Sequence, residues 1–145
     1  MTKKEYKDIY DVVGAAMEVH KTLGRGMAEA IYQEALAVEM KKRDMVVERE
    51  KLLLLHYKDV LLEKVYYADL YYHGVIIELK SVDEIISDHR AQLFNYMRIT
   101  GNYRGILLNF GEKKLRAERY LYLQEDDDFI LLSQDNYKDY IEDSD

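Results

Sequence analysis

The 145-residue chain contains no cysteine, no proline and no tryptophan. The absence of cysteine excludes disulfides and thiolate metal sites, and it agrees with a reducing compartment. The sequence has no run of about 18 apolar residues, and its charged N-terminus lacks the apolar region of a signal peptide. We therefore expect a cytoplasmic protein with no membrane partner.

The negative charge is concentrated at one end of the chain. Residues 124–145 contain nine acidic residues and one lysine, whereas the 123 residues before them contain 20 basic and 19 acidic residues. We expect a single domain over residues 1–123 and an acidic C-terminal extension over residues 124–145. The near-neutral body can bind a polyanion locally, although it has no pronounced basic stripe.

A β-hairpin is predicted over residues 66–81. β-Branched and aromatic residues lie on both sides of His73-Gly74, a pair that suits a two-residue turn because glycine, and to a lesser degree histidine, accepts positive φ. Such a turn fixes the register and places Asp69 directly opposite Glu78. Directly opposite residues share one face of a sheet, with Cβ atoms about 5 Å apart.

Two carboxylates in this position should repel each other. At an effective dielectric of about 20 the cost is roughly 3 kcal/mol. A divalent metal ion such as magnesium reverses that interaction, because it prefers hard oxygen ligands. Lys80 projects from the same face as Glu78 and is suited to holding a water or a phosphate beside the metal. The alternative is a solvated strand face on which Asp69, Glu78 and Lys80 form ordinary surface pairs.

The rest of the chain alternates between helical and strand patterns. Four consecutive leucines, Leu52 to Leu55, suggest a strand covered on both faces. The order of elements implies a mixed α/β domain. Helices are predicted over residues 4–22, 28–43 and 82–100, and strands over residues 46–50, 52–57, 60–72, 75–80, 104–110, 115–123 and 129–132.

Side chains on two helices could converge on the hairpin. Glu29 and Tyr32 share a face of the second helix, although Glu29 would also suit the positive end of its helix and Tyr32 the core. On the third helix, Gln92 and Tyr96 form a polar stripe with His89. Gln92 could position a water or a phosphate oxygen, whereas a solvated helix face is the better interpretation of His89.

Several blocks resemble one family. Residues 26–32, Gly-Met-Ala-Glu-Ala-Ile-Tyr, match the motif that names the GxxExxY proteins, which are similar to the PD-(D/E)xK nuclease superfamily. The resemblance covers residues 8–122. It includes Asp69-Leu70, Ile77-Glu78-Leu79-Lys80-Ser81, Ala91-Gln92-Leu93 with Tyr96, and Leu107-Leu108-Asn109-Phe110-Gly111. Ala68 stands where the superfamily motif has its proline.

The resemblance implies a restriction-endonuclease-like core, an α/β fold in which helices flank a mixed β-sheet in the order α-β-β-β-α-β. Asp69 would be the motif aspartate, and Glu78-Leu79-Lys80 the (D/E)xK element. Glu29 resembles the additional helix acid of many such nucleases, and Gln92 the helix glutamine that some of them carry.

The hypothesis is a magnesium- or manganese-dependent phosphodiester hydrolase acting on DNA, in preference to RNA. Asp69 and Glu78 would hold the metal with Glu29 and, by resemblance, the Leu79 carbonyl; Lys80 would orient or help deprotonate the attacking water. Substrate or water contacts are assigned to Gln92, Tyr32 and Tyr96. The alternative is a non-catalytic nuclease-like module that binds a protein or nucleic acid. The sequence is also compatible with a homodimer.

Overall fold

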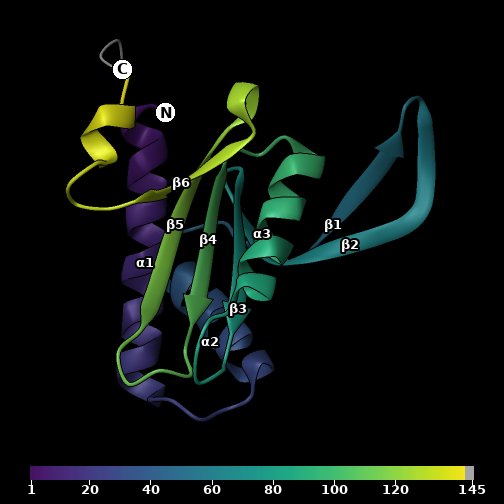
Figure 1. Ribbon diagram of the computed structural model, residues 1–145. Coiled ribbons are helices and arrows are strands. Elements are labelled where there is room, and N and C mark those ends of the chain that lie inside the picture. Colours follow the sequence, from purple (N-terminus) through teal and green to yellow (C-terminus); the bar gives the residue numbers. More distant parts are fainter. Residues whose placement is uncertain (143–145) are drawn as a thin grey trace.

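The computed structural model describes residues 1–142, which form one mixed sheet with helices on both faces (Figure 1). The three α-helices are α1 (Lys3–Leu23), α2 (Glu29–Lys42) and α3 (Ser87–Thr100). The strands are β1 (Glu48–Tyr57), β2 (Val60–Tyr72), β3 (Val75–Lys80), β4 (Arg104–Asn109), β5 (Arg116–Leu123) and β6 (Asp128–Leu132). Two short 3-10 helices, η1 (Gln124–Asp126) and η2 (Tyr137–Tyr140), complete the described chain.

The six strands within residues 1–142 lie in the order β1-β2-β3-β4-β5-β6. The pair β3–β4 is parallel and the other neighbours are antiparallel. One core cluster joins α1 and α2 to one face of the sheet, and a second joins α3 to the opposite face. Because both faces are covered, the central strands β3 and β4 are buried almost throughout. The predicted α/β fold with helices on both sides of a mixed sheet is confirmed.

Residues at its two ends determine where the first helix begins and ends. The Thr2 hydroxyl accepts the Glu5 N–H at 3.0 Å, and the Glu5 carboxylate accepts the Thr2 N–H at 2.8 Å. This reciprocal cap satisfies two N–H groups that a helix start leaves free. The helix ends at Gly24, whose φ of 71° is easily adopted by glycine. None of the helices within residues 1–142 is both long and apolar enough to cross a membrane.

The predicted hairpin register is confirmed. Tyr72 pairs with Val75, and the ladder continues to Leu70 and Ile77. His73 and Gly74 form the turn, with φ of 48° and 86°. Beyond Leu70 the two strands are no longer paired as a ladder.

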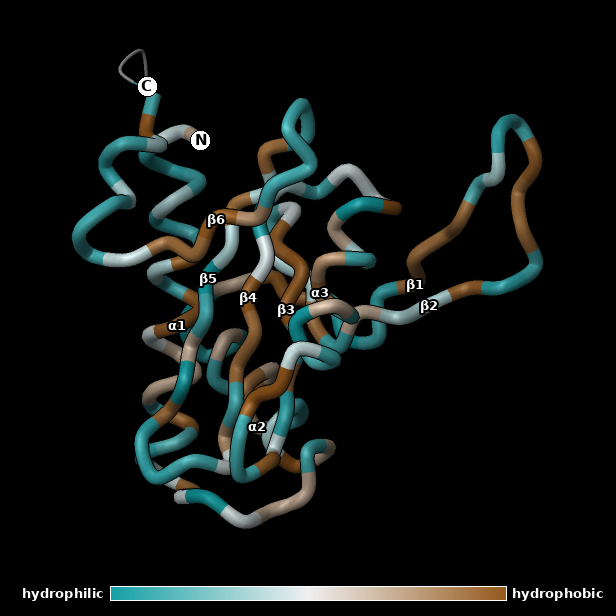
Figure 2. The backbone as a smooth tube through the Cα atoms, in the orientation of Figure 1, coloured by the Kyte–Doolittle hydropathy of each residue, from teal (hydrophilic) through white to brown (hydrophobic). Residues whose placement is uncertain are grey.

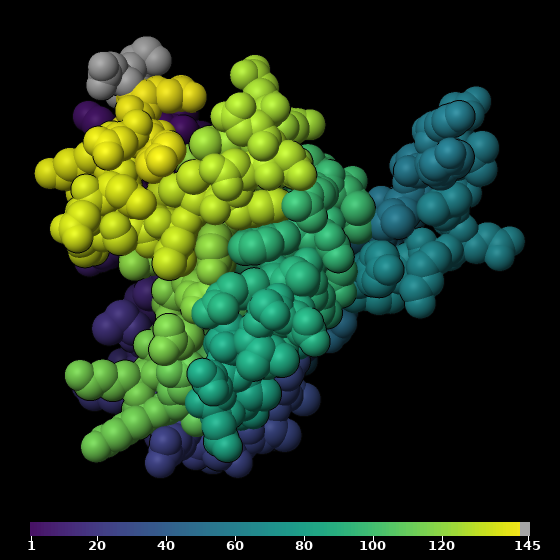
Figure 3. Space-filling model, viewed as in Figure 1, coloured from purple at the N-terminus to yellow at the C-terminus, as the bar shows by residue number. Residues whose placement is uncertain are grey.

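The outer part of β1 and β2 projects from the body as a two-stranded arm, which we define as residues 52–66 (Figures 1 and 3). Two of the four leucines at its start, Leu52 and Leu54, are 43% and 45% exposed. Figure 2 shows these hydrophobic stretches running along the arm away from the body. The prediction that Leu52 to Leu55 are covered on both faces is therefore wrong, because a run of leucines indicates a strand but not its place in the sheet.

The third helix begins five residues later than predicted, at Ser87 rather than Val82. The side chain of Asn109 accepts the Val82 N–H at 3.0 Å and donates to the Val82 carbonyl at 2.9 Å. The backbone of Val82 is thereby bound to the end of β4, so that it cannot enter a helix.

The segment after residue 123 lies against the domain. β6 pairs with β5, and Leu132 is only 2% exposed. Tyr137 in η2 stacks on Tyr6 of α1 with ring centroids 4.4 Å apart. The division at residue 123 stays a prediction. Within residues 124–142, β6 adds a strand to the edge of the sheet. Residues 143–145 lie outside the described part of the chain.

Candidate metal-dependent active site

The site begins where β2 and β3 separate, and we call this place the acidic fork, formed by Asp69, Glu78 and the backbone of Leu79. The Asp69 N–H donates to Glu78 Oε1 at 3.2 Å, and the Leu79 N–H donates to Asp69 Oδ2 at 2.8 Å. Each carboxylate thus accepts a backbone N–H from the opposite strand, just past the last paired residues. The expected approach of Asp69 and Glu78 is present in the structure.

The backbone carbonyl of Leu79 faces the same side. In a strand, the N–H and C=O of one residue point towards the same neighbour and alternate from residue to residue. The Leu79 N–H points to Asp69 on β2, whereas the carbonyl of Lys80 accepts from Phe110 beyond β4 at 2.8 Å. The Leu79 carbonyl therefore points towards Asp69.

Burial above all makes the two carboxylates of the acidic fork hard to ionise. Burial, followed by the charge of Asp69, raises the pKa of Glu78 well above its ordinary value. Burial also raises the pKa of Asp69, although the hydrogen bond from Leu79 opposes the shift. Glu78 is 2% exposed. A cation bound between these groups would favour their charged forms and so oppose both shifts.

Two residues that the sequence analysis did not assign to the site, Gln33 and Glu50, adjoin the fork. Gln33 Nε2 donates to Glu50 Oε1 at 2.9 Å and lies 3.4 Å from Asp69 Oδ1. Glu50 has a φ of 50°, and the β1–β2 ladder omits the pair Glu50 and Asp69 although it continues on both sides. Gln33 follows Glu29 by four residues, so the helical spacing placed it on the correct face, but nothing in the sequence pointed to Glu50.

The strand changes its packing at this irregularity. Ala68 belongs to the core cluster on the α3 side, and Leu70 to the cluster on the α1 and α2 side. Residues two apart in a regular strand would share one face. Asp69 lies between them, at the residue where β2 changes the face that it packs against the core.

A chain of polar contacts joins the fork to α3. Lys80 Nζ donates to Gln92 Oε1 at 3.1 Å, and Gln92 Nε2 donates to the Tyr96 hydroxyl at 3.0 Å. The charge of Lys80 lowers the pKa of both Asp69 and Glu78, although more weakly than burial raises them. The ammonium group is thus on the side of the sheet that the sequence predicted.

Glu29 approaches the same region from the start of α2. Burial, and after it the charge of Asp69, raises the pKa of the Glu29 carboxyl, while Lys80 lowers it. Glu29 therefore lies within electrostatic reach of both groups, although the residue as a whole is exposed.

Two candidates from the sequence have other roles. Tyr32 is fully buried, stacks on Phe110, and donates its hydroxyl to the Gly24 carbonyl at 2.6 Å. The structure does not bring Tyr32 to the site, and its predicted substrate contact is not retained. His89 Nδ1 accepts the Ile86 N–H at 3.1 Å, so its ring caps the start of α3.

The oxygen atoms of the acidic fork suit magnesium better than a metal ion whose ligands must all come from the protein. Among residues 1–142, no three acidic or histidine side chains form a ready-made metal cluster. Magnesium usually takes one or two carboxylates together with waters and substrate phosphates. Asp69, Glu78 and the Leu79 carbonyl supply hard oxygen atoms in that number, so the residues of the acidic fork fit this ion.

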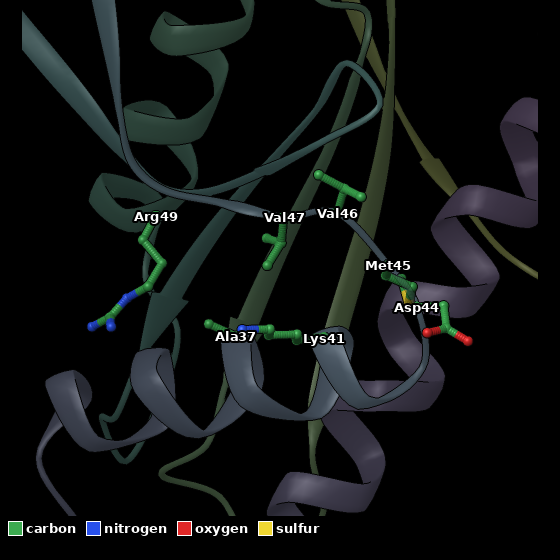
Figure 4. A pocket seen from close by; sticks show the side chains of 7 residues that line it. All are labelled: Ala37, Lys41, Asp44, Met45, Val46, Val47 and Arg49. Atoms are coloured by element: carbon green, nitrogen blue, oxygen red, sulfur yellow. The ribbon is translucent and has the colours of Figure 1, made fainter.

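A hollow of about 630 Å³ lies elsewhere, between α2 and the chain entering β1 (Figure 4). Its lining is mainly aliphatic and includes neither Asp69 nor Glu78. Arg49 links it to the site region, because its guanidinium donates to Gln33 Oε1 at 3.4 Å. An apolar hollow without convergent carboxylates does not support metal chemistry.

Comparison with known proteins identifies the family of the chain. No curated protein and no solved structure matches the chain significantly. The family model described as the PD-(D/E)XK nuclease superfamily matches residues 6–120, which include most of α1 and all of α2, β1 to β4 and α3. The chain belongs to the PD-(D/E)XK nuclease superfamily.

Proposed function

We propose that this protein is a magnesium-dependent phosphodiester hydrolase that acts on DNA, with manganese as an alternative ion. The observation that carries the proposal is the acidic fork, in which two carboxylates that repel each other are held together by backbone N–H groups. Nucleases of this superfamily typically use divalent metals. The motif over residues 26–32 further supports membership of the GxxExxY group.

Asp69, Glu78 and the Leu79 carbonyl would hold the metal, and Glu29 would bind it or its water from the α2 side. When bound, magnesium polarises the phosphoryl oxygen and neutralises charge that develops on it. The protein contributes a fixed arrangement of oxygen atoms in a buried fork, so that little rearrangement is needed.

Lys80 acts on the water and the phosphate. Its ammonium group would orient the attacking water and offset negative charge on the phosphate. The water oxygen forms a bond to phosphorus, one ester P–O bond breaks, and the leaving oxygen departs as an alcohol after taking up a proton. Gln92 holds Lys80 in position, and Gln92 and Tyr96 would contact a water or the backbone phosphate.

The test is cleavage of a DNA substrate by the full chain with and without magnesium. We expect Glu78→Gln to abolish divalent-dependent cleavage while leaving the fold intact. Glu63→Gln, at an exposed position on the arm, is the matched control and should cleave normally. Unchanged cleavage by the Glu78→Gln variant would reject the assignment.

The second candidate is a nuclease-like module that binds a protein or nucleic acid without cleaving it. It is favoured by the near-neutral body, which offers little electrostatic attraction for a duplex. Calorimetric titration separates the two functions. Magnesium or manganese binding that disappears in Asp69→Asn supports the hydrolase, whereas no binding at millimolar metal supports the module.

A further inference from the structure

A hollow of about 350 Å³ lies where the base of the arm meets α3. Figure 3 shows the surface of α3 against the start of the arm. Tyr66 of β2 forms one wall, and residues of α3 form the other, namely Asp88, Ala91, Gln92, Asn95 and Tyr96. We call this hollow the α3 subsite.

The α3 subsite shares a wall with the candidate active site. Gln92 accepts a hydrogen bond from Lys80 at 3.1 Å and donates one to the Tyr96 hydroxyl at 3.0 Å. A phosphate beside Lys80 and a group in the subsite would therefore lie on the two sides of one glutamine. A nucleotide likewise carries its base and its phosphate on one sugar, so a single nucleotide is the smallest ligand that would occupy both places.

The wall nearest the arm offers aromatic surface. Tyr66 is 37% exposed and Tyr96 is 6% exposed, with ring centroids 5.4 Å apart and planes tilted by 42°. Lys64 lies over the Tyr66 ring at 5.8 Å. An exposed ring with a nearby cation is what proteins use to stack an unpaired base and hold its backbone.

The wall on α3 offers polar groups at the edge of such a base. The Asp88 carboxylate is exposed and forms no hydrogen bond or ion pair within residues 1–142, so it can accept from the amino group of a base. The same negative charge would repel a phosphate. Gln92 Oε1 and Nε2 already bind Lys80 and Tyr96, and the amide carries no charge to attract a second phosphate. The subsite therefore suits a base better than a second phosphate.

We propose that the α3 subsite binds an unpaired nucleobase next to the phosphate held at Lys80, so that the substrate is single-stranded at the cleavage position. This inference rests on the proposed function and specifies its substrate. A base stacked inside a duplex cannot enter such a hollow without leaving the stack. Bases with an exocyclic amino group should be preferred, because Asp88 accepts from them.

The test is the affinity of the full chain for a fluorescent single-stranded oligo-dC, measured in EDTA so that cleavage does not interfere. Tyr66→Ala should weaken binding by about 5- to 150-fold, the range for losing one stacked base. Tyr67→Ala is the matched control, because Tyr67 is 51% exposed and does not line the subsite. It should bind like the unmodified protein.

Two further variants test stacking and base preference separately. Tyr66→Phe keeps the ring and should restore binding, which separates stacking from a folding defect. Asp88→Asn should reduce the preference for oligo-dC over oligo-dT. Equal affinity of Tyr66→Ala and the unmodified protein, tighter binding of duplex than of single strand, or no binding of single strand would each overturn the proposal.

Cleavage is measured separately, by adding magnesium to the same complexes. Tyr66-dependent binding without any cleavage would leave the subsite in place and reject the hydrolase. Metal-dependent cleavage of duplex that is unaffected by Tyr66→Ala would retain the hydrolase and reject the subsite. The two failures are thus distinguishable.

Discussion

The carboxylate of Glu78 accepts the backbone N–H of Asp69 at 3.2 Å, one position beyond the last residue pair of the β2–β3 ladder. The Leu79 N–H in turn donates to Asp69 Oδ2 at 2.8 Å. Backbone N–H groups of the opposite strand therefore fix both carboxylates in the fork. The arrangement stabilises the geometry of the site but leaves two like charges close together.

The first prediction concerns stability without metal. Because the pKa of Glu78 is raised in the folded state, the folded protein binds more protons than the unfolded protein above the ordinary carboxyl range, so stability falls as pH rises. Glu78→Gln removes the contribution of Glu78 to this dependence and should raise the free energy of unfolding by about 1 kcal/mol at neutral pH. Below about pH 3, where Glu78 is protonated in both states, the difference should vanish.

Urea unfolding of both proteins across this pH range checks the sign. Glu63→Gln, whose side chain lies on the exposed arm, should follow the unmodified protein at every pH. A Glu78→Gln variant that is less stable than the unmodified protein at neutral pH would contradict the electrostatic account of the fork.

The second prediction concerns metal addition. Magnesium at about ten times its dissociation constant should stabilise the folded protein by about 1.4 kcal/mol, which for a domain of this size raises the melting temperature by roughly 3–6 °C. EDTA should reverse the shift. Asp69→Asn should abolish it, whereas Asp59→Asn at the tip of the arm should not. A full shift in Asp69→Asn would place the metal elsewhere.

The third prediction concerns Lys80. Lys80→Met removes the ammonium group that Gln92 holds at 3.1 Å, and it should lower kcat for DNA cleavage by about 100-fold or more. Gln92→Ala leaves the charge but frees it to move, so we expect a smaller loss of about tenfold. Steady-state kinetics with Lys113→Met, at an exposed loop position, provide the control. An equal loss in Lys80→Met and Lys113→Met would show that the loss of a positive charge anywhere, and not the position of Lys80, affects the rate.

The fourth prediction concerns the turn after β4. A Cβ on Gly111 would lie 2.2 Å from the Val82 carbonyl oxygen, in the segment that follows Lys80. Gly111→Ala should therefore cost at least about 2 kcal/mol of stability and displace that segment. In Gly14→Ala the nearest contact would be Arg43 at 3.5 Å, and this helical change should stabilise by about 0.5–1 kcal/mol. Thermal melting of both variants tests the contrast, which would fail if Gly111→Ala melted like the unmodified protein.

The geometry of the hairpin could be predicted because it depends on local residues. The turn at His73-Gly74 sets the register, and the register brings Asp69 and Glu78 together with no information from the rest of the chain. Lys80 follows from the alternation of a strand. For the same reason, the order of helices and strands could be predicted from hydrophobic spacing.

Other features depend on contacts between distant segments. Glu50 reaches the fork only because its φ is positive and the β1–β2 ladder is interrupted there, and its sequence neighbours do not indicate either. The exposure of Leu52 and Leu54 follows from the arm leaving the sheet. The late start of α3 depends on Asn109, a residue 27 positions after Val82. Local patterns contain no information about such partners.

The most direct test of the account is a crystal of the full chain soaked in manganese, with the anomalous signal used to locate the ion. The account predicts a peak between Asp69 and Glu78, about 2.1 Å from an oxygen of each carboxylate, and no peak there in Asp69→Asn crystals. Manganese bound only at other positions, or no manganese at concentrations that saturate the protein in solution, would contradict a metal-dependent site in the acidic fork.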